Sequence, residues 1–253
     1  MNCSILPYSN EIRRYLERNG YRRCDPRAAL IDMDGTLYDS MVNHTAAWHR
    51  LMTEVGIPCT REEFYLYEGR TGADTINELF KRGKGREATQ EEKTRLYQLK
   101  TEYFRELPPV NRMPGALEMV TTLRKMGLKR VIVTGSGQRS LIDRLTADFP
   151  GLFSEDLMIT SRDVTHGKPD PEPYLKGMEL AGVKPWQAIV VENAPLGIEA
   201  GARSGAFTIG VTTGPIPADE MWRAGADVVF RSMESFATRV SLLLSSMMMI
   251  KND

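Results

Sequence analysis

Very little in this chain of 253 residues points to a membrane, a secretory route or a thiolate metal cage. Its three cysteines, Cys3, Cys24 and Cys59, lack metal-ligand spacing, which favours free thiols in a reducing compartment. The first twenty residues lack the apolar core of a signal peptide, so we expect a cytoplasmic protein. Residues 240–250, the most apolar stretch, are too short to span a bilayer and are expected to form a helix packed on the body.

There is no excess of charge of either sign, because 33 lysines and arginines stand against 33 aspartates and glutamates. A balanced chain has no long-range field that draws in nucleic acid or an anionic membrane, so we expect neither as a partner. Any anionic ligand must then be held by a local site. The hydrophobic share of 42% and the charged share of 26% are typical of a globular protein.

What the chain does contain is a regular alternation of short apolar runs and longer amphipathic stretches. Strands that alternate with helices predict a parallel sheet covered on both faces, an α/β architecture with a Rossmann-like three-layer core. The predicted strands span residues 28–31, 129–134, 156–160, 187–191, 206–211 and 227–230, and the helices between them span 115–126, 138–147, 171–182 and 195–204.

Residues 41–110 interrupt this alternation, because they are rich in charge and contain no convincing strand. Since they follow the first strand directly, we expect a helical cap over the carboxyl ends of the strands. We call residues 41–110 the cap, residues 25–40 and 111–253 the catalytic core, and residues 1–24 an N-terminal helical extension. The cap helices are predicted at 42–56, 61–68, 72–82 and 89–106.

The N-terminal extension contains one short amphipathic helix, predicted over residues 9–19. Ser9 or Asn10 would cap it, and Gly20 would end it. Docking on the core is expected, and disorder is the alternative.

Residues 28–40, AALIDMDGTLYDS, are the most informative stretch. The apolar run leads into Asp32 and Asp34, and a turn at Gly35 would place both carboxylates at the carboxyl end of a strand. Ligands of open α/β sheets bind at that edge. One carboxylate there can attack phosphorus to form an aspartyl-phosphate, and a second, pointing the same way, can handle the proton. The alternative is an acidic turn after a core strand.

Two more predicted strands lead into groups that suit a phosphate. Thr134, Gly135 and Ser136 offer a hydroxyl and backbone N–H groups at the start of a helix. Lys168 lies in a loop stiffened by two prolines, where its charge could balance a phosphate and the attacking carboxylate. A turn that only changes direction, and a solvated surface lysine, are the alternatives.

A further strand runs into Glu192 and Asn193. A carboxylate and an amide oxygen at a strand end suit Mg²⁺, which takes oxygen ligands in octahedral geometry, so we expect Mg²⁺ as the cofactor. Asn193 could also act as the N-cap of a helix that Pro195 begins, and both roles could hold together.

These four segments, each after a predicted strand, resemble the haloacid dehalogenase (HAD) superfamily. The cap position and the strings VENAPLGIEAG and GKPDPEPY resemble its β-phosphoglucomutase-like subfamily, over about residues 25–235. The resemblance implies in-line phosphoryl transfer. It also implies that Asp32 is the nucleophile and a Mg²⁺ ligand. Asp34 would be the general acid/base and would bind the metal through its backbone carbonyl.

The same resemblance assigns the remaining groups. It implies that Thr134 and the N–H of Gly135 hold the phosphoryl oxygens. Lys168 would neutralise charge in the transition state. Glu192 and Asn193 would serve the metal site.

Two departures from the family's pattern concern the metal and the substrate. The family usually has Asp at the position of Asn193, so the metal site lacks one negative charge. We expect Glu68, in the cap string YEGRTGADT, to reach the metal when the cap closes; a solvated glutamate is the alternative.

The subfamily's sugar-phosphate mutases carry a cap arginine for the distal phosphate. In the mutases this arginine follows shortly after a glycine. When Gly69 is aligned with that glycine, Gly72 stands at the position of the arginine, and Arg70 lies two positions before it.

The mutases also carry a lysine–asparagine pair where this chain has Gly137 and Gln138, so the groups that grip a hexose bisphosphate look incomplete. The combination of YEGRTG, Asn193 and VTGSGQ resembles instead an inorganic pyrophosphatase of the subfamily. His44 and Arg70 could line the closed space over such a substrate.

We therefore expect a Mg²⁺-dependent phosphohydrolase, with pyrophosphate or another small phosphorylated compound as its partner, in a monomer or weak homodimer. β-Phosphoglucomutase activity, a small-metabolite phosphatase and a non-catalytic binder are the alternatives. The complete set of catalytic groups argues against a binder. Trp48 could also line the closed space, although it is more typical of a core.

Overall fold

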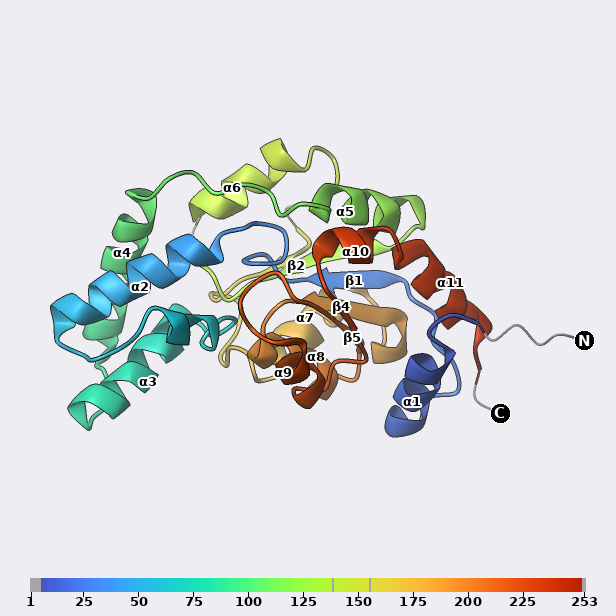
Figure 1. Ribbon diagram of the computed structural model, residues 1–253, viewed down its shortest axis with the longest axis horizontal. Helices are drawn as coiled ribbons and strands as arrows, with labels where there is room; N and C mark the ends of the chain where they lie inside the picture. The colour runs from blue at the N-terminus through green and yellow to red at the C-terminus, as the bar shows by residue number, and fades with distance from the viewer. Residues whose placement is uncertain (1–5, 138, 155, 252–253) are drawn as a thin grey trace, which may run out of the picture.

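Six parallel strands form one sheet at the centre of the computed structural model, which describes residues 6–137, 139–154 and 156–251 (Figure 1). Cys3 and Gln138 lie outside the described residues. The strand order is β3-β2-β1-β4-β5-β6, and every neighbouring pair is parallel, which confirms the predicted α/β fold. The strands are β1 Ala28–Ile31, β2 Lys129–Val133, β3 Met158–Ile159, β4 Ala188–Glu192, β5 Phe207–Val211 and β6 Val228–Phe230.

Helices cover both faces of the sheet, as the alternation predicts. α5, α10 and α11 lie on one face, and α7, α8 and α9 lie on the other (Figure 1). Two short helices, α9 and α10, are not among the predicted ones. The bounds are α5 Ala116–Lys125, α6 Arg139–Asp148, α7 Glu172–Ala181, α8 Pro195–Arg203, α9 Ala218–Arg223, α10 Met233–Ala237 and α11 Val240–Met249.

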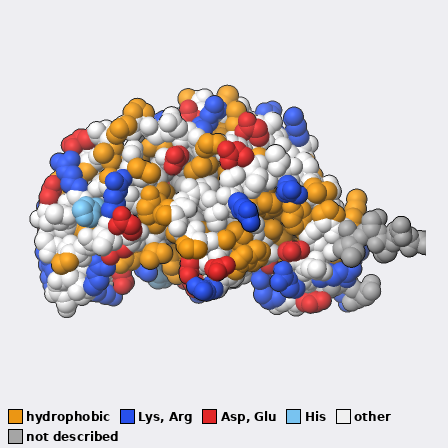
Figure 2. All heavy atoms as spheres, viewed as in Figure 1, with side chains coloured by type: hydrophobic (Ala, Val, Ile, Leu, Met, Phe, Trp, Pro, Cys, Tyr) orange, Lys and Arg blue, Asp and Glu red, His pale blue; other side chains and the backbone are white. Residues whose placement is uncertain are grey.

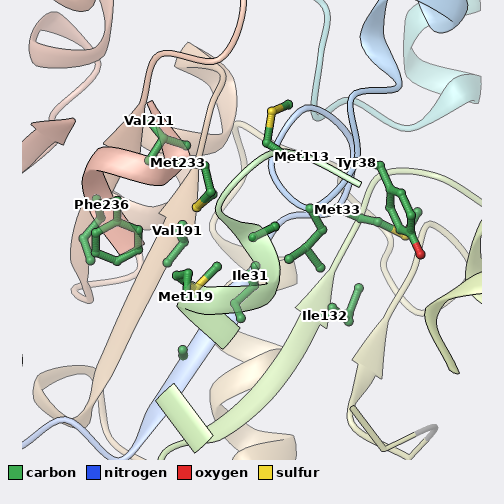
Figure 3. Packing of buried hydrophobic residues seen from close by; sticks show 14 of the residues in the cluster. Ile31, Met33, Tyr38, Met113, Met119, Ile132, Val191, Val211, Met233 and Phe236 are labelled. Carbon is green, nitrogen blue, oxygen red and sulfur yellow. The ribbon is translucent and has the colours of Figure 1, made fainter. Parts of the chain in front are cut away.

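The larger apolar core lies between the sheet and the layer of α5 and α10. Ile31, Ile132 and Val191 from three adjacent strands lie beside Met119 of α5 and Met233 of α10 (Figure 3). All five side chains are fully buried. Branched side chains pack well on a pleated surface, so this core holds the three strands from whose ends the candidate site groups emerge.

The cap consists of α2, η1, α3 and α4, which pack on one another at one end of the molecule (Figure 1). The helix predicted over residues 61–68 is wrong in extent, because only a single 3₁₀ turn forms there. Gly69 adopts a φ of 91°, which a helix does not accommodate, so the chain turns before α3. The bounds are α2 Met41–Val55, η1 Glu62–Tyr65, α3 Gly72–Lys84 and α4 Gln90–Arg105.

Two chain segments join the cap to the core, and they run side by side. The N–H of Asp39 donates to the carbonyl of Asn111 at 3.0 Å. The N–H of Met113 donates to the carbonyl of Leu37 at 2.8 Å. The cap is therefore attached at one place, directly after the loop that carries the two motif aspartates.

Helix α1, Ser9–Asn19, docks on the core at the end of the molecule away from the cap (Figure 1). Ile12, Tyr15 and Leu16 are fully buried. The hydroxyl of Tyr15 donates to the carbonyl of Gly205 at 2.9 Å. Docking, rather than disorder, is what the structure shows for these residues.

The predicted N-cap residue of helix α1 is wrong. The helix begins at Ser9, so Ser9 and Asn10 lie inside it, and Tyr8 occupies the N-cap position without a side-chain hydrogen bond. Gly20 does end the helix, in the left-handed conformation that glycine adopts readily.

No helix in the described part of the chain is long and apolar enough to cross a membrane. Residues 240–250 form α11 as expected, with Leu243 and Leu244 buried. Cys24 and Cys59, the two described cysteines, are free thiols. On the face shown in Figure 2, basic and acidic side chains are intermixed, in keeping with the balanced charge.

Replacing Leu16 by Ala is expected to lower the free energy of unfolding by about 2–5 kcal/mol, because a fully buried side chain is lost and a cavity remains. Urea unfolding measures this change. Arg13→Ala, at an exposed position of the same helix, is the control and is expected to change little. An unchanged midpoint for Leu16→Ala would mean that α1 is not part of the cooperative fold.

Candidate active site

Three of the predicted strand-end groups converge at one edge of the sheet. Asp32 follows β1, Thr134 follows β2, and Glu192 ends β4, and β1 lies between the other two strands. The N–H of Asp32 donates to the carbonyl of Val191 at 3.0 Å, so the aspartate is still held by the sheet. The strand order changes direction at β1, where open α/β sheets leave a crevice for ligands.

Lys168 is buried at the centre of this edge and is only 2% exposed. Its Nζ donates to Oδ1 of Asp32 at 2.6 Å and to Oε1 of Glu192 at 2.7 Å. It also donates to the carbonyl of Val133 at 3.0 Å. All three ammonium hydrogens therefore have acceptors. Loss of one partner would leave a buried charge uncompensated, so this cluster fixes the geometry of the site.

Burial and charge act in opposite directions on these groups. Burial raises the pKa of Asp32, and the ammonium of Lys168 opposes that rise. Burial would lower the pKa of Lys168, but Asp32 and Glu192 raise it above its ordinary value. Lys168 therefore stays protonated, and its charge favours Asp32 as a carboxylate.

Both carboxylate oxygens of Glu192 bind protein donors. Besides the lysine, Oε1 accepts from the hydroxyl of Tyr174 at 2.8 Å. Oε2 accepts from the N–H groups of Asn193 at 2.9 Å and Ala194 at 3.2 Å. A Cβ on Gly197 would lie 1.8 Å from Oε1, so only glycine leaves room for this carboxylate. These contacts argue against Glu192 as a direct metal ligand and make it a group that positions the lysine.

The second motif aspartate is bonded into the cap. Oδ1 of Asp34 accepts from the hydroxyl of Ser40 at 2.7 Å and lies 3.0 Å from Nε2 of His44. Nδ1 of His44 lies 2.5 Å from Nζ of Lys100 in α4. Since an ammonium can only donate, Nδ1 accepts, and Nε2 carries the hydrogen that His44 donates to Asp34. His44 was predicted to face the site, but Lys100 was not.

Burial shifts the charges along this chain of hydrogen bonds. It lowers the pKa of His44, and Lys100 lowers it further, so the imidazole is neutral. Burial would raise the pKa of Asp34, but the bonds from His44 and Ser40 bring it below its ordinary value. Burial lowers the pKa of Lys100 to about 7. The hydrogen-bonded series of Asp34, His44 and Lys100 therefore gains or loses one proton, that of Lys100, close to neutral pH.

The cap contacts the loop after β4 through Glu68. Its Oε1 accepts from Nδ2 of Asn193 at 2.8 Å, and Oδ1 of Asn193 accepts from the hydroxyl of Thr36 at 2.8 Å. The predicted N-cap role of Asn193 is wrong, because Ala194 precedes the helix and both ends of the amide are bonded elsewhere. Glu68 is 7% exposed, and burial raises its pKa well above its ordinary value. The alternative of a solvated glutamate is therefore excluded.

Two glycines of the core allow the cap to lie this close. A Cβ on Gly35, whose φ is 78°, would lie 2.1 Å from Nδ2 of Asn193 and 2.6 Å from Oε1 of Glu68. A Cβ on Gly135 would lie 2.7 Å from the carbonyl oxygens of residues 69–70. Side-chain carbons do not approach other atoms so closely, so any other residue would push the cap away.

A cavity of about 60 Å³ lies between the cap and the core. The predicted substrate groups all border it. The side chain of Arg70 reaches it with an Nε that is buried and has no hydrogen-bond partner among the described residues. From the core the lining residues are Asp32, Asp34, Thr134, Gly135 and Ser136, and from the cap they are Met41, His44, Trp48, Phe64, Tyr67, Glu68, Gly69, Arg70, Gly72, Thr75, Tyr97 and Lys100.

The oxygen groups at this edge suit Mg²⁺. Oδ2 of Asp32 and Oε2 of Glu68 are buried, and neither has a hydrogen-bond partner in the described part of the chain. A buried carboxylate oxygen without a partner is costly unless a cation meets it. The described residues contain no group of three His, Cys, Asp or Glu side chains that could cage a metal. The ligand set would therefore be mixed, with the amide of Asn193 and the carbonyl of Asp34 beside the two carboxylates.

Comparison with known families decides the classification. The family model described as haloacid dehalogenase-like hydrolase matches residues 29–211, which include all four strand-end motifs. The chain belongs to the haloacid dehalogenase-like hydrolases. The resemblance inferred from the motifs is thereby confirmed, and the protein is an enzyme of the phosphohydrolase type.

Relatives of this hydrolase differ in their described activities. It is 32% identical to validoxylamine A 7′-phosphate phosphatase of Streptomyces hygroscopicus subsp. limoneus, over 82% of this chain and 94% of the relative. It is 30% identical to a "Putative pyrophosphatase PpaX" of Clostridium perfringens, over 79% and 91%. A solved structure described as "Putative beta-phosphoglucomutase from Bacteroides vulgatus" superposes with a TM-score of 0.91 at 47% identity, over 95% and 98% of the two chains.

In this haloacid dehalogenase-like hydrolase, Lys100→Met is expected to change the pH profile of kcat/KM. The native ammonium loses its proton as pH rises through about 7, which removes a positive charge from the cavity and weakens binding of an anionic substrate. The native kcat/KM should therefore fall above pH ~7, whereas the variant should be about 10–100-fold less active below that pH and lack this limb.

The profile is measured from pH ~5.5 to ~9 with pyrophosphate and with a phosphate monoester. Arg95→Met removes an exposed cation from the same helix and serves as the control. If Lys100→Met keeps the native fall above neutral pH, the titrating group lies elsewhere.

Proposed function

We propose that this hydrolase is a Mg²⁺-dependent phosphohydrolase that cleaves inorganic pyrophosphate through an aspartyl-phosphate on Asp32, with residues 41–110 acting as one cap. The observation that carries the proposal is the small, cation-lined cavity under the closed cap. Its volume of about 60 Å³ corresponds to roughly four to six water molecules. A phosphate group suits that space better than a hexose does.

Asp32 is prepared as the nucleophile. Lys168 fixes its Oδ1, while Oδ2 is buried without a donor from the part of the chain that the structure describes. In the proposed first half-reaction an oxygen of Asp32 attacks one phosphorus, the bond from that phosphorus to the bridging oxygen breaks, and phosphate leaves with the bonding electrons. Thr134 and Gly135 border the cavity, and the hydroxyl of the first and the N–H of the second would hold the transferred oxygens.

Asp34 handles the proton of the second half-reaction. Its depressed pKa makes it a carboxylate near neutral pH, the form that accepts a proton from water. The water oxygen then attacks the aspartyl-phosphate, Asp32 is released, and the proton passes from Asp34 to the second phosphate or to solvent. A phosphate leaves as a stable anion and needs less acid assistance than a sugar alkoxide, so an ionised Asp34 favours pyrophosphate.

Two cap cations suit a charged leaving group. Lys100 borders the cavity, and Arg70 has a buried Nε free of protein acceptors in the described residues. A second phosphate would supply an acceptor to Nε of Arg70 and a negative charge close to Lys100, whereas a sugar hydroxyl would leave their charge unbalanced. When bound, Mg²⁺ would supply further neutralisation of the phosphoryl oxygens, and Asp32, Glu68 and Asn193 would hold it.

Hydrolysis of a sugar phosphate is the second candidate. The similarity to validoxylamine A 7′-phosphate phosphatase favours it. So do four aromatic side chains in the cavity wall, which suit an apolar sugar face: Trp48, Phe64, Tyr67 and Tyr97. β-Phosphoglucomutase activity is the third, favoured by the similarity to the Bacteroides vulgatus structure. It requires space for a bisphosphate to turn round between the cap and the core.

Phosphate release with Mg²⁺ distinguishes these candidates. We expect kcat/KM for pyrophosphate to exceed that for glucose 6-phosphate by at least about 100-fold, with negligible conversion of β-glucose 1-phosphate to glucose 6-phosphate. Asp32→Asn should lose at least about 10³-fold, which separates an enzyme from a binder. Faster hydrolysis of the hexose phosphate would replace pyrophosphatase by sugar phosphatase as the function, and efficient mutase turnover would replace both.

Glu68→Gln is expected to raise the Mg²⁺ concentration for half-maximal turnover by about 10–100-fold. The amide can still accept the hydrogen bond from Asn193 at 2.8 Å, so the change removes the charge while it keeps the contact. Glu62→Gln, at an exposed cap position, is the matched control. Unchanged Mg²⁺ dependence in Glu68→Gln would rule out a role for Glu68 at the metal.

A further inference from the structure

Gly72 is the first residue of α3 and has no conformational need to be glycine. Its backbone is helical, a conformation open to every residue type at the first position of a helix. Glycine also weakens a helix relative to alanine. The reason for glycine at this position must therefore lie in the space around it.

That space is filled by the ring of Tyr97 from α4. A Cβ on Gly72 would lie 2.1 Å from Cδ2 and 2.2 Å from Cε2 of Tyr97. No side chain fits between the helix and the ring. Gly72 and Tyr97 both border the cavity. The tyrosine ring therefore occupies the part of the cavity wall that a side chain at position 72 would otherwise occupy.

The hydroxyl of Tyr97 ties the cap to the core. It accepts a hydrogen bond from the N–H of Gly137, in the loop after β2, at 3.0 Å. Trp48 supports the ring from the side, with ring centroids 6.4 Å apart. The tyrosine therefore both narrows the cavity and bonds to the opposite wall when the cap is closed.

We propose that Tyr97 sets the size limit for the leaving group, by filling the space before Gly72 and latching the closed cap to Gly137. This inference rests on the proposed phosphohydrolase function and narrows its substrate class to phosphates with a small leaving group. A bulky leaving group would meet the ring before the hydroxyl reaches Gly137. The cap would then stay open, and Glu68 would be held away from Asn193.

The test compares three variants on substrates of increasing size: pyrophosphate, glycerol phosphate and glucose 6-phosphate. Tyr97→Ala and Tyr97→Leu remove the ring, whereas Tyr97→Phe keeps it and loses only the hydroxyl. We expect both ring-deleting variants to shift the ratio of kcat/KM for glucose 6-phosphate over that for the smaller substrates by at least about tenfold toward the sugar. Tyr97→Phe should keep the native ratio while all its values fall.

Gln98→Ala, at the exposed neighbouring position on α4, is the control for effects on the helix itself. Thermal unfolding shows which variants are folded, and Tyr97→Leu keeps the test valid if Tyr97→Ala is not. An unchanged ratio in the folded ring-deleting variants would overturn the size limit. A shift in Tyr97→Phe as large as that in Tyr97→Leu would overturn the role of ring volume.

Failure of this inference is distinct from failure of the proposed function. If the native enzyme does not hydrolyse pyrophosphate, the pyrophosphatase proposal fails. The ratio between glycerol phosphate and glucose 6-phosphate still tests the size limit, because both are monoesters that differ in the bulk of the leaving group.

Discussion

One buried cation, Lys168, holds the candidate site together. It lies between Asp32 and Glu192, and its third hydrogen reaches the main chain of β2. These bonds link groups from the ends of three adjacent strands through a residue that comes from a separate loop. The sheet positions the carboxylates, and the ammonium of Lys168 opposes the rise that burial causes in the pKa of Asp32.

The cap contributes an acidic side chain to the candidate site of the core. Glu68 brings a carboxylate to Asn193, where the family usually has an aspartate. The exchange of Asp for Asn is consistent with this partner, because the amide of Asn193 donates to Glu68 at 2.8 Å and an ionised aspartate there could not donate. The cap thus brings a carboxyl group to the core loop, and the oxygen atoms of Glu68 and Asn193 lie together only where the two parts meet.

Much of this could be predicted from the sequence, because its signals are local. The six strands and the strand-end position of Asp32 follow from apolar runs that end in polar groups, and the place of Lys168 follows from its proline-stiffened loop. Lys100 and Tyr97 could not be found this way, since they belong to a charge-rich helix with no motif and reach the site only through the packing of α4. The helix predicted over 61–68 forms only as the 3₁₀ turn Glu62–Tyr65, and the sequence pattern did not distinguish the two.

The two segments that connect the cap to the core lie side by side, and this arrangement affects how such enzymes can diversify. Asp39 bonds to Asn111 and Leu37 bonds to Met113, so the inserted segment leaves and re-enters the core at neighbouring points. A segment whose ends lie together can be exchanged without stretching the host fold. The core chemistry and the substrate-selecting helices are therefore separable in evolution and in engineering, and a graft at these two crossings would transplant a new specificity onto an unchanged nucleophile.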